Sequence, residues 1–193
     1  MKTGYRVEID SRDSVMKRFG NQLGALGEGK ARAAMARAVN HTGAKTYTAV
    51  RRALAQQTSA PVAIIRKEVQ LRKAAHKGTG AIEAVIRGRG SELPLGVFKP
   101  KQFSYGVRVK VWGKVQQYKS MFGAPGRNPK LVARLGGQPH IRVGKERFPI
   151  QRAYGPSLPK EMVKDATREA FLTVSKDVLE KRLEHEIGRM LKI

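Results

Sequence analysis

The side chains of this chain best suited to act together chemically are lysines and arginines between residues 51 and 101. They occur as adjacent pairs and as single residues at Arg51, Arg52, Arg66, Lys67, Arg72, Lys73, Lys77, Arg87, Arg89, Lys99 and Lys101. Cationic groups spaced in this way could follow the phosphates of a nucleic acid, in contacts that tolerate any base sequence and weaken with salt. The pattern therefore indicates a polyanion-binding surface. For the predicted helix that carries Arg66, Lys73 and Lys77, an ordinary solvated face explains the same residues equally well.

Residues suited to catalysis or metal binding are scattered. The basic middle of the chain holds three carboxylates, too far apart in sequence to predict a general acid/base pair: Glu68, Glu83 and Glu92. The four histidines match no zinc-binding spacing: His41, His76, His140 and His185. The glycine-containing segments 78–80 and 88–90 flank a predicted strand and lack the lysine of a phosphate loop, which favours turns. We therefore expect no catalytic residue, no metal site and no cofactor, with a nuclease using one of the three carboxylates as the weaker alternative.

The charge of the chain is large and unevenly distributed. Its 193 residues contain 39 Lys and Arg against 15 Asp and Glu, a formal net charge of +24. Between Lys30 and Lys145 there are 24 basic residues and three acidic ones. This excess predicts a polyanionic partner, either a nucleic acid or an acidic protein surface. Aromatic residues make up only 6% of the chain, and no motif for reading base edges is present, so non-specific contact with duplex DNA is favoured over base stacking or sequence recognition.

The composition also bounds the cellular context. The absence of cysteine excludes disulfides and thiolate metal sites. The first ten residues lack the apolar segment of a signal peptide, and no apolar run approaches the roughly 20 residues that span a bilayer. We therefore expect a protein without a membrane segment that is made in the cytoplasm.

Two helices are predicted in the region 28–77. Apolar residues recur three and four positions apart from Glu28 to Gln57, as on one face of a long helix, with Gly43 as a bend or weak point. Ser59 and Pro61 suit the start of a second helix, on which Val62, Ile65 and Val69 share a face. Upstream, residues 7–9 suit a short strand and 13–26 a weak helix.

A sheet is predicted in the region 80–150. Runs rich in β-branched and aromatic residues occupy 81–87, 96–98, 104–112, 116–118, 141–143 and 148–150. In the third run Tyr105, Val107, Val109 and Val111 alternate with Arg108 and Lys110, so one face of the sheet should be basic. The glycine-rich, proline-rich segment 120–138 is predicted to be a basic loop, and long loops of this kind are usually functional.

A long helix is predicted over 157–191. Ser157 can cap it, Pro159 suits its first turn, and a drifting apolar stripe continues to Leu191. Together these elements predict one domain, residues 1–193, of the α+β class. In it, an antiparallel sheet packs with a long helix from the N-terminal half and a long C-terminal helix.

Several segments resemble the prophage minor tail protein Z family, the tail completion protein of lambda-like phages. They are 145–150 (KERFPI), 153–156 (AYGP), 166–171 (ATREAF) and 179–183 (LEKRL). The order is that of an Arg-aromatic-Pro-Ile strand, a short proline-containing crossing and a terminal helix. The alanine-rich helix around 38–40 and the predicted basic helix around 66–73 are similar in order and character.

The resemblance implies a virion protein that acts late in tail assembly, near the end of the tail that joins the head. It implies a homo-oligomeric ring around the DNA channel, with other tail or neck proteins as partners, and assembly in the host cytoplasm. The basic residues would then face either packaged duplex DNA or an acidic neighbouring protein. A free, non-specific nucleic-acid-binding protein is the alternative that composition alone permits.

Overall fold

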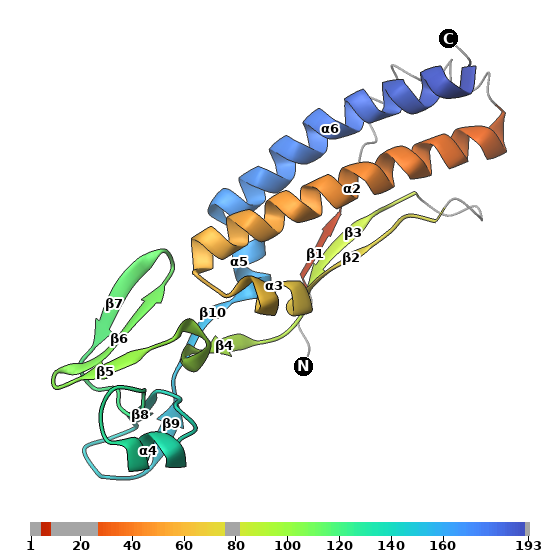
Figure 1. Cartoon of the computed structure of the whole chain (residues 1–193). Helices are drawn as coiled ribbons and strands as arrows, with labels where there is room; N and C mark the ends of the chain where they lie inside the picture. Colours follow the sequence, from red (N-terminus) through yellow and green to blue (C-terminus); the bar gives the residue numbers. More distant parts are fainter. Residues whose placement is uncertain (1–4, 9–26, 76–81, 192–193) are drawn as a thin grey trace.

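Two long helices, α2 (Glu28–Thr58) and α6 (Asp165–Leu191), lie side by side and antiparallel along one end of the molecule (Figure 1). The computed structural model describes residues 5–8, 27–75 and 82–191. Strands β1 (Tyr5–Glu8), β2 (Val69–Arg72) and β3 (Val85–Gly88) lie alongside α2, and most of the other small strands and helices continue from the lower end of the helix pair, so the molecule is elongated (Figure 1). The mixture of helices and antiparallel strands confirms the α+β class. No helix among the described residues is long and apolar enough to cross a membrane.

Helix α2 forms where the sequence predicts it, and it is buried on more than one side. Alanines at 31, 34, 36 and 38 and hydroxyl side chains at 42 and 46 are buried along it, so neighbouring elements approach its backbone closely. Gly43 causes no break in this helix. A Cβ built on it would lie 3.0 Å from the Cβ of Ala84, so the glycine is explained by the close packing of α2 on the strand region.

The C-terminal helical region is divided, and the prediction of one continuous helix over 157–191 is wrong. A short helix, α5 (Leu158–Met162), ends near Val163, and α6 begins at Asp165, whose φ of 44° is left-handed. Gln57 of α2 bridges the interruption. Its Nε2 donates to the carbonyl oxygen of Glu161 at 3.1 Å, and its Oε1 accepts from the backbone nitrogen of Thr167 at 3.2 Å.

A buried carboxylate joins α2 and α6 near their other ends. Glu186 of α6 is 0% exposed and accepts from Arg37 Nε of α2 at 2.7 Å. Arg182 and Arg189 of α6 contact the same carboxylate at 2.6 and 2.8 Å. Burial acts to raise the pKa of Glu186, but the Arg37 hydrogen bond and the charges of Arg182 and Arg189 outweigh it and hold the pKa below its ordinary value.

The predicted second helix is shorter than expected. Helix α3 (Val62–Glu68) ends where strand β2 (Val69–Arg72) begins, so the helical prediction is wrong for residues 69–75; residues 76 and 77 lie outside the described part of the chain. Ser59 ends α2 in a left-handed conformation instead of capping α3. Pairing with strand β3 (Val85–Gly88) explains the change from helix to strand, because it buries Val69 and leaves Arg72 exposed.

Strand β1 (Tyr5–Glu8) completes this sheet in the order β1-β3-β2 and confirms the short strand predicted there, except for Ile9. Ile9 and the weak helix predicted over 13–26 lie outside the described residues.

The remaining strands form three small antiparallel sheets, so the prediction of one sheet is wrong. They are β4 (Glu92–Pro94) with β10 (Tyr154–Ser157); β5 (Lys101–Phe103), β6 (Gly106–Val111) and β7 (Lys114–Tyr118); and β8 (His140–Arg142) with β9 (Ile150–Arg152). Residues 96–98, predicted as a strand, belong to the 3-10 helix η1 (Leu95–Phe98), which buries Leu95 and Phe98 three positions apart. Strand β6 shows the expected alternation, with Val107, Val109 and Val111 buried and the basic side chains between them exposed.

The segment 120–138 is more ordered than a loop. It contains helix α4 (Pro129–Arg134), whose first turn is capped by the Asn128 side chain accepting from the backbone nitrogen of Leu131 at 3.2 Å. Phe122 pairs with His140 in an isolated antiparallel bridge, which joins the segment to strand β8. The prediction of a structureless loop is therefore wrong for residues 129–134.

Candidate polyanion-binding surface

Strands β2 and β3 bring three of the predicted basic residues together around one hollow of about 370 Å³. We call it the arginine hollow; its lining is Gln70, Leu71, Arg72, Val85, Arg87 and Arg89. The antiparallel register creates it, because Gln70 lies opposite Arg87 and Arg72 lies opposite Val85. The three arginine side chains are exposed at its rim, where an anion could approach them.

The charges of the arginine hollow are only partly neutralised. Arg72 forms an ion pair with Glu83, with 2.5 Å between Nη2 and Oε1. Among the described residues, neither Arg87 nor Arg89 has a carboxylate partner. The backbone nitrogen of Arg89 donates to the Glu68 carbonyl oxygen at 2.8 Å, which fixes the start of the segment after β3 against the end of α3. Two arginines on anchored backbone are thus available to an external anion.

Arg66 and Lys67 lie next to the arginine hollow in the chain. Both are exposed in the last turn of α3, immediately before Glu68, whose carbonyl anchors Arg89. The end of α3 and the residue after β3 are therefore in contact, which brings the turn that carries Arg66 and Lys67 to one end of the β2–β3 pair.

The other predicted residues lie elsewhere. Arg52 is exposed on α2, and the half-buried Arg51 places its guanidinium 4.9 Å from the centre of the Tyr47 ring. Lys73 is exposed just after β2. Lys99 follows η1, and Lys101 of β5 lies opposite Arg108 of β6 on the exposed face of that sheet. Lys77 lies outside the described residues.

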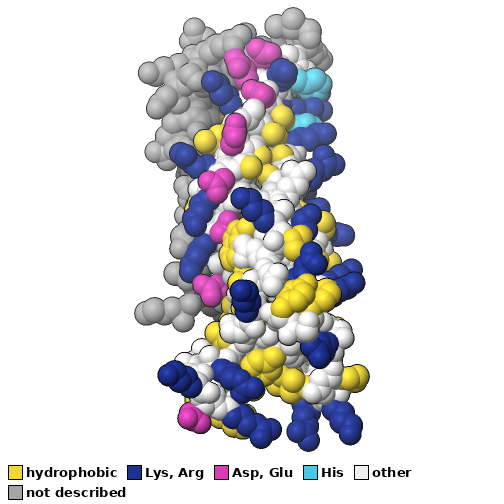
Figure 2. Space-filling model, turned by 90° about the vertical axis from the view of Figure 1, so that its left-hand side faces the viewer, with side chains coloured by type: hydrophobic (Ala, Val, Ile, Leu, Met, Phe, Trp, Pro, Cys, Tyr) yellow, Lys and Arg dark blue, Asp and Glu magenta, His cyan; other side chains and the backbone are white. Residues whose placement is uncertain are grey.

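Basic side chains cover the whole length of one face of the molecule. In Figure 2, Lys and Arg are spread from end to end, whereas Asp and Glu gather mainly along the upper half. Such an extended positive surface suits a long polyanion better than a single small ligand.

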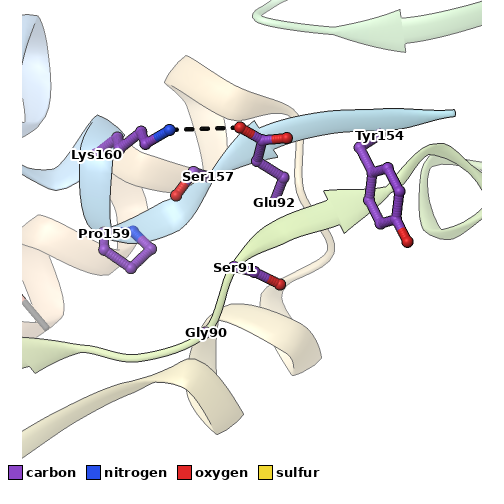
Figure 3. Close-up of a pocket in the computed structure, with 7 residues that line it drawn as sticks. All are labelled: Gly90, Ser91, Glu92, Tyr154, Ser157, Pro159 and Lys160. Carbon is purple, nitrogen blue, oxygen red and sulfur yellow. Dashed lines mark hydrogen bonds and ion pairs between the residues drawn. The ribbon is translucent and has the colours of Figure 1, made fainter. Parts of the chain in front are cut away.

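A second hollow, of about 300 Å³, contains residue types found in catalytic sites. Its lining is Gly90, Ser91, Glu92, Tyr154, Ser157, Pro159 and Lys160 (Figure 3). Lys160 Nζ points to Glu92 Oε1 at 3.3 Å, while Tyr154 lies on the other side of Glu92 (Figure 3). The Ser157 side chain makes no hydrogen bond with α5, which begins after it. Lys160 is paired with the Glu92 carboxylate, and among the described residues no hydrogen bond joins Ser157 to a base, so the geometry shows no activated nucleophile.

The three carboxylates of the weaker nuclease alternative do not converge. Glu83 pairs with Arg72, Glu92 pairs with Lys160, and Glu68 lies at the end of α3. Within residues 5–8, 27–75 and 82–191, no three His, Cys, Asp or Glu side chains form a group that could hold a metal ion.

Sequence reasoning missed one basic cluster, in a groove between α2 and α6 of about 440 Å³. We call it the histidine groove; its lining is His41, Lys45, Val178, Lys181, Arg182 and His185. His41 and Lys45 lie one helical turn apart, as do Lys181 and His185, and this spacing was the available signal. Only the register of the two helices shows that the pairs face one groove.

Comparison of the chain with protein-family models, with curated proteins and with solved structures found no match.

Proposed function

We propose that this chain is a structural protein of a phage tail, without enzymatic activity, that acts late in tail assembly near the junction with the head. The resemblance over residues 145–183 supports the tail assignment. The observation that carries the polyanion contact is the arginine hollow, where β2 and β3 hold Arg72, Arg87 and Arg89 at one rim. In the tail, this surface contacts the phosphates of packaged duplex DNA.

The geometry favours phosphate contact over base recognition. The arginines lie on strands and on the turn after them, beside the end of a seven-residue helix, and no long helix presents them to a DNA groove. Exposed guanidinium groups attract phosphates of any sequence. A protein around a DNA channel needs this property, because every sequence of the genome passes it.

The assembly part of the proposal, a homo-oligomeric ring, is supported by exposed apolar side chains far from the arginine hollow. Val115 of β7 is 59% exposed and Phe148, just before β9, is 65% exposed. Strand β7 is also the edge of its sheet, so its free backbone groups can pair with a neighbouring chain. We propose that this end of the molecule contacts the next subunit or a neighbouring tail protein.

The proposal is tested by removing the gene from the prophage that carries it and examining induced particles by electron microscopy and infectivity counts. We expect malformed tails, tails without heads, or joined particles that do not infect. Wild-type protein and the control variant Arg168→Glu/Lys176→Glu should restore infectivity, because both control residues are exposed on α6 outside the arginine hollow. Arg87→Glu/Arg89→Glu should not. Normal infectious particles without the gene would contradict the tail assignment.

Purified protein then separates the partners. Loss of duplex DNA binding by Arg87→Glu/Arg89→Glu, but not by the control, supports DNA contact. Wild-type protein that binds no DNA at low salt, yet depends on Arg87 and Arg89 for infectivity, would assign the hollow to an acidic neighbour instead. A monomer that binds DNA tightly at physiological salt and is dispensable for particles would favour the free nucleic-acid-binding protein.

A further inference from the structure

The histidine groove is a second basic site that shares no lining residue with the arginine hollow. Two turns of helix form it: His41 and Lys45 from α2, and Val178, Lys181, Arg182 and His185 from α6. Five of these six side chains are lysine, arginine or histidine, and none is acidic. In Figure 2, histidine side chains lie among Lys and Arg near the upper end of the molecule.

One carboxylate that acts on this groove is already shared among several arginines. Glu186 is fully buried and contacts Arg37, Arg182 and Arg189, so three guanidinium groups share one negative charge. Lys45 and Lys181 add two exposed positive charges at the surface. The groove therefore keeps an excess of positive charge that an incoming anion can offset.

The pKa of His41 reflects the same positive charges. Partial desolvation at the groove lowers the pKa of the surface residue His41, and the charges of Arg182, Lys45 and His185 lower it further against the opposing effect of Glu186. A bound anion would counter those charges and favour the imidazolium form. Anion binding and proton uptake by the groove are thus linked, and each should strengthen the other.

We propose that the histidine groove binds a phosphate group, and that binding tightens as the pH falls from neutral toward 5.5. Lys45 and Lys181 act as point charges on either side, Arg182 offers a planar donor, and the imidazole of His41 donates when protonated. The phosphate group is common to a free or terminal phosphate and to the phosphodiester of a nucleic acid. This inference is independent of the proposed function, because it uses none of the residues on which that function rests.

The first test measures binding of inorganic phosphate and sulfate to the full chain by calorimetry. Sulfate keeps its charge between pH 5.5 and 7.5, so a change in its affinity over that range reports the protein. We expect Lys45→Gln/Lys181→Gln to weaken both anions about tenfold, while Arg168→Gln/Lys176→Gln, which removes the same charge from exposed positions of α6 outside both basic sites, leaves them unchanged. No anion binding, or equal weakening by the two variants, would overturn the proposal.

The second test concerns His41. Wild-type affinity for sulfate should rise as pH falls, and His41→Gln should remove that rise while keeping the thermal melting profile, since the side chain reaches the surface. An unchanged pH dependence in this variant would overturn the linkage.

A third test uses short DNA duplexes with and without a terminal phosphate to identify which phosphate the groove binds. Preference for the phosphorylated duplex that is lost in Lys45→Gln/Lys181→Gln would assign a terminal phosphate. Equal weakening of both duplexes by this variant would assign the phosphodiester.

Discussion

Gln57 at the end of α2 and Thr167 at the start of α6, 110 positions apart in sequence, are joined by two hydrogen bonds. Gln57 Oε1 accepts from both the backbone nitrogen and the hydroxyl of Thr167, at 3.2 and 2.8 Å. The amide nitrogen of the same side chain donates to the carbonyl and carboxylate oxygens of Glu161. One glutamine thus satisfies groups at the end of α5 and at the start of α6, which a continuous helix would have satisfied itself.

Replacing Gln57 should therefore destabilise the protein more than replacing its exposed neighbour Gln56. Gln57→Ala removes a cap and leaves part-buried polar groups unpaired, so we expect the free energy of unfolding to fall by about 2 kcal/mol. Gln56→Ala, one position earlier on the exposed side of α2, should change it by less than about 0.5 kcal/mol. Urea denaturation followed by circular dichroism measures both, and equal losses would contradict the junction.

This junction also marks the limit of what the sequence could predict. The helical face of α2 was predictable because its apolar residues recur with helical period. The break before Asp165 was not, because it depends on a side chain about a hundred residues away. The spacing of apolar residues fitted a helix that continued through Val69 to Arg72. Pairing with Val85 to Gly88 makes this segment a strand instead.

The candidate site divides in the same way. The residue types of a polyanion surface were evident in the sequence, and Arg72, Arg87 and Arg89 do meet. They meet because of a strand register that no local pattern encodes. His41 of α2 and His185 of α6 line one groove because of the register between the two helices, which no local pattern encodes either. Neither basic site could therefore be outlined before the fold was known.

Glu186 provides a second prediction about stability. Glu186→Gln leaves Arg37, Arg182 and Arg189 close together without their shared carboxylate, and we expect a loss of about 3 kcal/mol in the free energy of unfolding. Glu169→Gln, which is exposed on the same helix, should be close to neutral. Similar effects of the two variants would show that the buried contacts contribute little.

The same carboxylate should make stability depend on acid. Because the pKa of Glu186 is lower in the folded protein than in the unfolded chain, its contribution is fully present above the unfolded pKa, near 4.3, and is lost as pH falls through the folded value. The difference in unfolding free energy between wild type and Glu186→Gln should therefore be constant above about pH 5 and shrink below pH 4. A difference independent of pH down to 3 would contradict this account.

Two helical glycines should respond in opposite directions to alanine. At Gly43 a Cβ would lie 3.0 Å from that of Ala84, and we expect Gly43→Ala to lower the free energy of unfolding by about 1 kcal/mol. At Gly188 of α6 a Cβ meets nothing within 4 Å, so Gly188→Ala should raise it by about 0.5–1 kcal/mol. Thermal unfolding compares them, and stabilisation by Gly43→Ala would show that the strands yield easily.

The arginine hollow predicts a change in salt dependence. If Arg87 and Arg89 each neutralise one phosphate, Arg87→Gln/Arg89→Gln should reduce the slope of log affinity for duplex DNA against log salt by about 2. Arg168→Gln/Lys176→Gln should leave that slope unchanged. Fluorescence anisotropy across a salt series gives the slopes, and an equal decrease in both variants would indicate diffuse attraction instead of local contacts.

The pairing of α2 with α6 also constrains the order of events during synthesis. Arg37 meets its partner 149 positions later in the chain, so the ribosome must deliver all the intervening strands before the two helices can close. Until then, the alanine-rich surface of α2 is uncovered in the cell, and the nascent chain is at its most vulnerable to chaperone capture and proteases. Folding of this protein is therefore expected to finish after translation of α6, with the arrival of that helix as its rate-limiting step.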